Sequence, residues 1–354
     1  MIYSVGAALV KRAMDPDTKV PVNETPAWLW LIILFNCLLF IPLYTWLNYT
    51  VHNVWPVFAI IEDENPPEYE PVSLNEDGSA DGPIPGQPIA VSSSARSIHR
   101  LLMANGGFRA NFRGLACFLV QAVLTVALVL VFVGALGTGG TSIATLLASL
   151  TLIQFSTAWV HIIITRPSDL HFWSRLPSFN HTFNATWKPV VLLWAATEVT
   201  RWLPRIFALI AGIDLPDLNS GFNGPKNPES GIKVDPALRW AAPVMVVLSL
   251  LGVIFLTIPA QVILFRVQAS LLPADAETII NFDRSFQGQV GPVITTGKGY
   301  ATVSQAWSTF TRAAWRRLVA LYCKIFLISA LVVIFVTIIA IPEMIIIFLN
   351  MPHA

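Results

Sequence analysis

Six ionisable side chains stand inside stretches that are otherwise apolar: Glu198, Arg201, Arg205, Lys324, Glu343 and His161. A charge in hydrocarbon costs roughly 2.5–3.5 kcal/mol on insertion scales, so such residues normally face a bundle interior or a watery cavity and have a partner. Glu198 and Arg201 are three residues apart on one helical face, and Arg205 follows one turn later. We therefore predict a polar stripe that lines a path or a gate. The alternative is an ion pair that only holds its own helix to a neighbour.

The remaining reactive residues do not have the spacing of an enzyme or a metal site. The six histidines lack the H-E-x-x-H pattern, and the sequence has no phosphate-binding loop, nucleophile elbow or dinucleotide motif. Cys37, Cys117 and Cys323 lie in apolar blocks and fit neither a disulfide framework nor a zinc site. We expect no catalytic residue, no cofactor and no metal. The net charge of +1 gives no reason to expect nucleic acid as a partner.

Membrane spans are the elements that must position the ionisable residues. Charged residues make up 12% of the 354, against about 25% in soluble domains, and the mean hydropathy is +0.63. Six stretches are long and apolar enough to cross a lipid bilayer as helices: 27–50 (running on as far as 61 in one reading), 114–136, 141–165, 189–213, 237–265 and 318–349.

The lysines and arginines predict the orientation of these spans. Thirteen of them lie in the loops after spans 1, 3 and 5, and six lie on the opposite side. Basic loops stay on the cytosolic or matrix side of a membrane, so we expect both termini, including the N-terminal tail 1–25, on the other side.

The long basic-side loops carry features of their own. Residues 62–94 are acidic and rich in proline, glycine and serine, which predicts a disordered insert. Residues 95–113 place Ile98, Leu101 and Leu102 on one face, as in a helix that lies on a membrane surface. A similar stretch precedes span 6.

Three odd-numbered spans contain related sequences. Span 5 ends in Pro259-Ala-Gln-Val-Ile-Leu-Phe-Arg266-Val-Gln268, and span 3 ends with Trp159 followed seven residues later by Arg166. Span 1 contains Pro42-Leu43-Tyr44, so the three starts are 117 and 100 residues apart. This resembles the repeated signature of the mitochondrial carrier family, in which a proline, an acid two residues later and a base at the eighth position end each odd-numbered helix.

The resemblance implies an all-α integral membrane fold with six transmembrane helices in three two-helix repeats and with surface helices on the odd-numbered loops. The repeats would be 26–136, 137–213 and 214–354, with kinks at Pro42 and Pro259. It also implies transport of a small solute across a mitochondrial membrane, with the plasma membrane or an endomembrane as alternatives. The family's acids are replaced by Tyr44, His161 and Gln261, so the ionic gate on the odd-numbered helices lacks its negative charges.

A short motif in the insert favours a different role. Pro66-Pro67-Glu68-Tyr69 is a P-P-x-Y sequence, which WW domains bind as an extended polyproline segment with an aromatic end. The alternative hypothesis is therefore a membrane adaptor that does not transport and that recruits a WW-domain ubiquitin ligase. This use of Pro66, Pro67 and Tyr69 requires the odd-numbered loops to face the cytosol.

Overall fold

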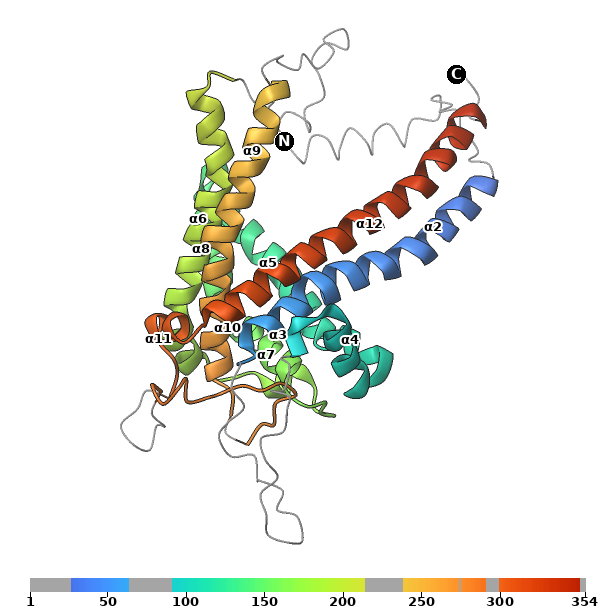
Figure 1. Cartoon of the computed structure of the whole chain (residues 1–354). Helices are drawn as coiled ribbons and strands as arrows, with labels where there is room; N and C mark the ends of the chain where they lie inside the picture. Colours follow the sequence, from blue (N-terminus) through green and yellow to red (C-terminus); the bar gives the residue numbers. More distant parts are fainter. Residues whose placement is uncertain (1–26, 64–90, 214–237, 274, 291–298, 351–354) are drawn as a thin grey trace, which may run out of the picture. The chain divides into compact units, whose positions relative to one another are not determined.

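A computed structural model describes residues 27–63, 91–213, 238–273, 275–290 and 299–350, and all regular elements in these ranges are helices. In chain order they are α2 (Ala27–Thr45), η1 (Trp46–Val54), α3 (Trp55–Ile61), η2 (Val91–Ser93), α4 (Ala95–Ala104), η3 (Gly107–Phe112), α5 (Leu115–Leu136), η4 (Thr138–Gly140), α6 (Thr141–Thr151), α7 (Ile153–Ile164), η5 (Phe172–Arg175), α8 (Phe179–Ile210), α9 (Leu238–Gly252), η7 (Val253–Thr257), α10 (Ile258–Ser270), α11 (Val303–Ser308) and α12 (Arg312–Asn350) (Figure 1). They divide into a larger unit, Trp46–Leu327, and a smaller one that contains α2 and the C-terminal half of α12.

Four helical stretches in the described ranges are long and apolar enough to cross a membrane: Leu29–Ile61, Gly107–Leu136, Trp240–Ser270 and Arg312–Ile345. The pair α6 and α7, bent by 58°, makes a fifth if it is one span. Large apolar side chains cover their surfaces, such as Val123 at 69% exposure on α5. Apolar surface of this extent suits lipid and not water. The chain is an all-helical, multi-pass membrane protein.

The sixth expected span, 189–213, corresponds to α8. This helix is 32 residues long, but it is not among the stretches that are apolar enough to qualify. Glu198, Arg201 and Arg205 all lie within two of its turns. The four qualifying stretches and the bent pair coincide with the other five expected spans, so a count of six rests on α8.

Three of the long helices are interrupted midway: the pair α6 and α7 bends by 58°, and the other two contain π-helices. A π-helix, η1, separates α2 from α3, and a second one, η7, separates α9 from α10. Pro56 and Pro259 each stand at the second residue of the helix that follows. Proline lacks an amide hydrogen and its ring crowds the carbonyl four residues earlier, and a local π-turn relieves that crowding. Pro42, where a kink was expected, lies inside α2, which stays α-helical as far as Thr45.

The C-terminal halves of these broken helices form the core of the larger unit. Helices α3, α7 and α10 contact one another pairwise. All seven residues of α3 are buried, and most of α7 and α10 is buried too. A helix that is buried all round belongs to a core and not to a surface. We call the packed junction of α3, α7 and α10 the closed end of the larger unit.

The loops at this closed end are held by side chains. The buried carboxylate of Glu62 accepts hydrogen bonds from the backbone N–H groups of Val91 and Ser92, at 2.6 and 2.7 Å. The two ends of the expected insert are thereby fixed beside each other, while residues 64–90 lie outside the described ranges. Residues 95–113, where a surface helix was expected, contain α4 and η3, and α4 buries Ile98 and Leu102 within the protein.

In the smaller unit, a polar contact joins two apolar helices. The amide Nδ2 of Asn36 on α2 donates to Oε2 of Glu343 on α12, at 2.7 Å. This contact gives Glu343 a hydrogen-bond partner, as a carboxylate in a membrane span requires.

Candidate functional site

A cavity of about 370 Å³ lies among α5, α6, α7, α8 and α10 in the larger unit. Its lining combines polar and aromatic side chains. The polar ones are Asn53, Gln121, Thr125, Thr145, Ser149, Ser156, Thr197, Glu198 and Gln268, and the aromatic ones are Phe118, Trp159, Trp194 and Phe265. Polar side chains are expensive in lipid, and here they converge on one partly open cavity.

Glu198 is the one charged residue in this lining. Its Oε2 is ion-paired with Arg201 and accepts a hydrogen bond from the hydroxyl of Ser142, at 3.1 Å. Arg201 also donates to that hydroxyl, at 2.7 Å, so the pair joins α8 to α6. Arg205 lies elsewhere: it is exposed, and its guanidinium stacks 5.2 Å from the ring of Trp202. The structure therefore separates the expected stripe into a cavity residue, its partner and an outer residue.

The floor of the cavity is linked to a buried histidine. Gln268 donates from Nε2 to the hydroxyl of Ser156, at 2.8 Å, and its main-chain oxygen lies 2.8 Å from Nε2 of His161. Gln268 is fully buried, and its Oε1 has no hydrogen-bond partner among the described residues. His161 lines a separate cavity of about 510 Å³ on the loop side of the core. A short polar connection therefore crosses the layer between the two cavities.

The closed end contains a buried ion pair. Arg266 on α10 is 1% exposed and donates to Oδ1 of Asp63 at 3.2 Å, to the main-chain oxygen of Ile60 and to the hydroxyl of Thr309. Two phenylalanine rings cover its guanidinium, those of Phe286 at 5.0 Å and Phe310 at 5.7 Å. This arginine ties α10 to the end of α3 and to the loop before α12.

A strained turn positions one of these rings. Phe286 has φ 50°, in the left-handed region that costs a side-chain-bearing residue roughly 1–2 kcal/mol. Asp283 holds the turn by accepting from the backbone N–H groups of Ser285 and Gln287, at 2.8 and 2.7 Å.

The two aspartates near Arg266 are shifted in opposite directions. Burial raises the pKa of Asp63 in spite of the neighbouring Arg266 charge. Burial would also raise the pKa of Asp283, but hydrogen bonds from Ser285 and Gln287, together with the Arg266 charge, outweigh it and lower that pKa. Asp63 is therefore the carboxylate that is ionised at the higher cost.

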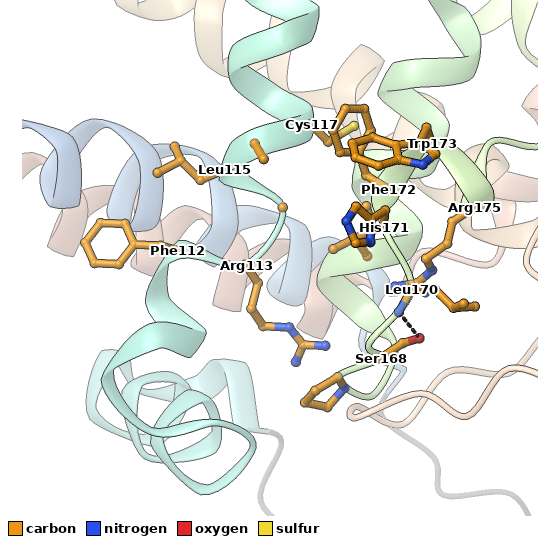
Figure 2. A pocket seen from close by; sticks show the side chains of 14 residues that line it. Phe112, Arg113, Leu115, Cys117, Ser168, Leu170, His171, Phe172, Trp173 and Arg175 are labelled. Carbon is orange, nitrogen blue, oxygen red and sulfur yellow. Dashed lines mark hydrogen bonds between the residues drawn. The ribbon is translucent and has the colours of Figure 1, made fainter.

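A third cavity, of about 480 Å³, lies between the start of α5 and the loop after α7 (Figure 2). Arg113 and Arg175 lie at its edge. Arg113 donates to the main-chain oxygen of Thr165, and Arg175 donates to the hydroxyl of the same residue, at 2.7 Å. Burial lowers the pKa of Arg175. Gly114 begins α5 with φ 73°, and a β-carbon there would lie 3.2 Å from Trp159. Arg113 therefore joins the start of α5 to the end of α7, and Arg175 joins η5 to the same residue, Thr165.

The other expected site residues lie apart from the cavity among the helices. Arg166 forms an exposed ion pair with Glu277, at 2.5 Å. Lys324 is half-buried in α12. Pro66, Pro67 and Tyr69 lie outside the described residues.

Sequence reasoning missed two groups of residues. Asp63 was assigned to the insert, although it follows Pro56 by seven residues, as Arg266 follows Pro259. The cavity hydroxyls were missed as well. Their signal is small polar residues three or four apart inside apolar helices, as at Thr145 and Ser149.

This arrangement can bind a small molecule by hydrogen bonds and aromatic contact. No group of three histidine, cysteine, aspartate or glutamate side chains gathers for a metal within the ranges described above. No family model, curated protein or solved structure matches this chain.

Proposed function

We propose that this protein moves a small solute across a membrane and that the cavity among α5, α6, α7, α8 and α10 holds the solute in passage. The observation that carries the proposal is the polar lining of a cavity in a bundle whose outer surface is apolar. Polar side chains inside a membrane bundle add little to the stability of the fold, but a water-soluble ligand needs them as hydrogen-bond partners.

The proposal takes α8 as the sixth span. Its charged residue Glu198 faces the cavity, and its partner Arg201 is joined to α6 through Ser142. A span that carries charge toward an interior cavity is less apolar than its neighbours, and this accounts for the low hydropathy of α8.

The carrier resemblance supports the same proposal when Pro56 replaces Pro42 as the first signature residue. Pro56, Trp159 and Pro259 follow one another at intervals of about 100 residues. Pro56 and Pro259 stand at the second residue of α3 and α10, and Trp159 lies in the middle of α7, the third helix of the closed end. We take this agreement as support for three two-helix repeats, in which α3, α7 and α10 close one side of the path.

The test is uptake by purified protein reconstituted in liposomes, with mass spectrometry of the contents after incubation in a mixture of water-soluble metabolites. Ser149 is exposed to the cavity, so Ser149→Trp fills the path without entering the packed core. We expect this variant to lose uptake while its melting temperature stays close to that of the wild type. The control is Val123→Trp, on the outer surface of α5, which should retain uptake. Equal uptake by the two variants, or none by the wild type, would contradict the proposal.

The adaptor hypothesis remains a second prediction, because its motif lies outside the described residues. We expect a peptide of residues 62–73 to bind a WW domain and Tyr69→Ala to abolish the binding, since the aromatic side chain anchors the extended segment. Equal binding by both peptides in a calorimetric titration would remove this hypothesis.

A further inference from the structure

The hydrogen-bonding groups of the cavity lining are strongly unbalanced. Five hydroxyls face it, and each donates its single proton to a main-chain carbonyl of its own helix at 2.7–3.0 Å: those of Thr125, Thr145, Ser149, Ser156 and Thr197. A hydroxyl has one proton and two lone pairs, so these groups offer acceptor oxygens to a ligand.

Most other donors in the lining are also used within the protein. The indole N–H of Trp159 donates to the hydroxyl of Tyr49 at 3.1 Å, and that of Trp194 donates to the main-chain oxygen of Ser142 at 2.8 Å. The amide of Asn53 donates to the main-chain oxygen of Asn48 at 2.6 Å. Only the apolar faces of the two indole rings are therefore available to contact a ligand.

The unfilled groups at the floor of the cavity are acceptors too. Gln268 donates one of its two amide hydrogens to Ser156, and its Oε1 is buried without a partner among the described residues. A buried acceptor of this kind gains stability from any donor brought within reach. Among the described residues that line the cavity, Gln121 is the one whose side-chain amide donates to no other group of the protein, while Asn53 and Gln268 each keep a second amide hydrogen.

The charge of the lining excludes a negative ligand. No lysine, arginine or histidine is among the described residues of the lining, and its one charge is the carboxylate of Glu198. Arg201 already neutralises that carboxylate from outside the lining, so a cation gains little extra attraction. A carboxylate or phosphate here would meet acceptor oxygens and no cation with which to pair, and an unpaired buried charge is costly.

We propose that the cavity takes an uncharged solute that is rich in hydroxyl groups, a polyol, and that it rejects carboxylates and phosphates. The inference rests on the proposed transport function and gives its substrate class. Polyol hydroxyls donate to the acceptor oxygens, while C–H faces lie against the four aromatic rings. A volume of about 370 Å³ suits a molecule at the small end of the range for ligand sites.

The experiment measures uptake of radiolabelled sorbitol, myo-inositol, putrescine, malate and phosphate into proteoliposomes of the wild type. We expect saturable uptake of sorbitol or myo-inositol, unaffected by excess malate or phosphate. Preferred uptake of malate, phosphate or putrescine would overturn the inference and leave the transport function standing. If the wild type takes up none of these solutes at a rate that Ser149→Trp reduces, the transport function itself is overturned.

A matched pair of variants tests the charge argument within one position. Gln121→Leu removes one ligand donor and is expected to lower polyol uptake by about tenfold, the equivalent of one lost hydrogen bond. Gln121→Arg places a cation in the same lining and is expected to admit malate while polyol uptake falls. If both variants retain the wild-type preference and rate, the lining does not select the solute and the inference fails.

Discussion

At the scale of single residues, two arginines at corresponding positions have opposite environments. Arg266 follows Pro259 by seven residues and is 1% exposed, whereas Arg166 follows Trp159 by seven residues and has a side chain 68% exposed. Solvent screens an exposed ion pair, so it contributes little, whereas a buried charge depends on its partners. Arg266 is therefore a structural arginine, and Arg166 is replaceable.

We predict that Arg266→Met lowers the free energy of unfolding by about 3–5 kcal/mol, because it leaves the carboxylate of Asp63 buried without its partner. Arg166→Met removes a pair of the same chemistry from the surface and should cost less than about 1 kcal/mol. Denaturation of both variants in detergent, followed by tryptophan fluorescence, measures the difference. Equal losses would show that the buried pair does not hold the closed end.

The sequence indicated the ionisable residues of the apolar spans more readily than their partners. The ion pair of Glu198 with Arg201 follows from their spacing on one helix. Asp63 could not be assigned to Arg266 in the same way, because it stands at the edge of an acidic, proline-rich stretch and its partner is 203 residues away. A contact between residues so far apart in the chain depends on how the helices pack, and the local sequence pattern does not predict it.

At the scale of elements, the contact of α8 with α9 and η7 depends on a missing side chain. Gly252 ends α9, and a β-carbon placed there would lie 2.9 Å from Thr200 Cγ2 and 3.0 Å from Leu203 Cδ1. Figure 1 shows α8 and α9 side by side along their lengths. Glycine at this point lets the two helices approach closely.

Gly252→Ala should therefore force α8 and α9 apart and lower the melting temperature, with an overpacking cost of about 1–3 kcal/mol. Gly134 in α5 provides the control, because a β-carbon there meets nothing within 4 Å. Gly134→Ala should be neutral or raise stability by up to about 1 kcal/mol, since alanine favours the helix. If alanine at 252 is tolerated as well as alanine at 134, the close approach is not required.

The helices themselves were largely predictable, and their interruptions were not. Apolar length placed five of the six expected spans on helices or on the bent pair, because burial in lipid depends on composition. The π-helices at 46–54 and 253–257 depend on how the backbone relieves the crowding at Pro56 and Pro259. Pro42, which precedes Pro56 in the same long helix, causes no such break. The proposed repeats therefore take Pro56, in place of Pro42, as the first signature residue.

At the scale of the whole molecule, exposed apolar side chains on the long helices are combined with a polar cavity inside the larger unit. Composition and hydropathy were enough to predict a multi-pass membrane protein. The cavity could not be predicted, because its lining comes from η1 and five α-helices, whose polar residues face a common space only when the helices pack. A path for solute further requires that water reach this cavity from each side of the membrane in turn.

Cysteine accessibility at Thr197 tests that requirement most directly. Thr197 lines the cavity and is exposed, and Cys37, Cys117 and Cys323 are first replaced by alanine to give a silent background. With a membrane-impermeant thiol reagent applied to sealed vesicles of either orientation, we predict that Thr197→Cys reacts from both sides and that solute slows the reaction. Val123→Cys, on the lipid-facing surface of α5, should stay unreactive. Reaction of Thr197→Cys from neither side, or from one side alone under all conditions, would contradict transport through this cavity.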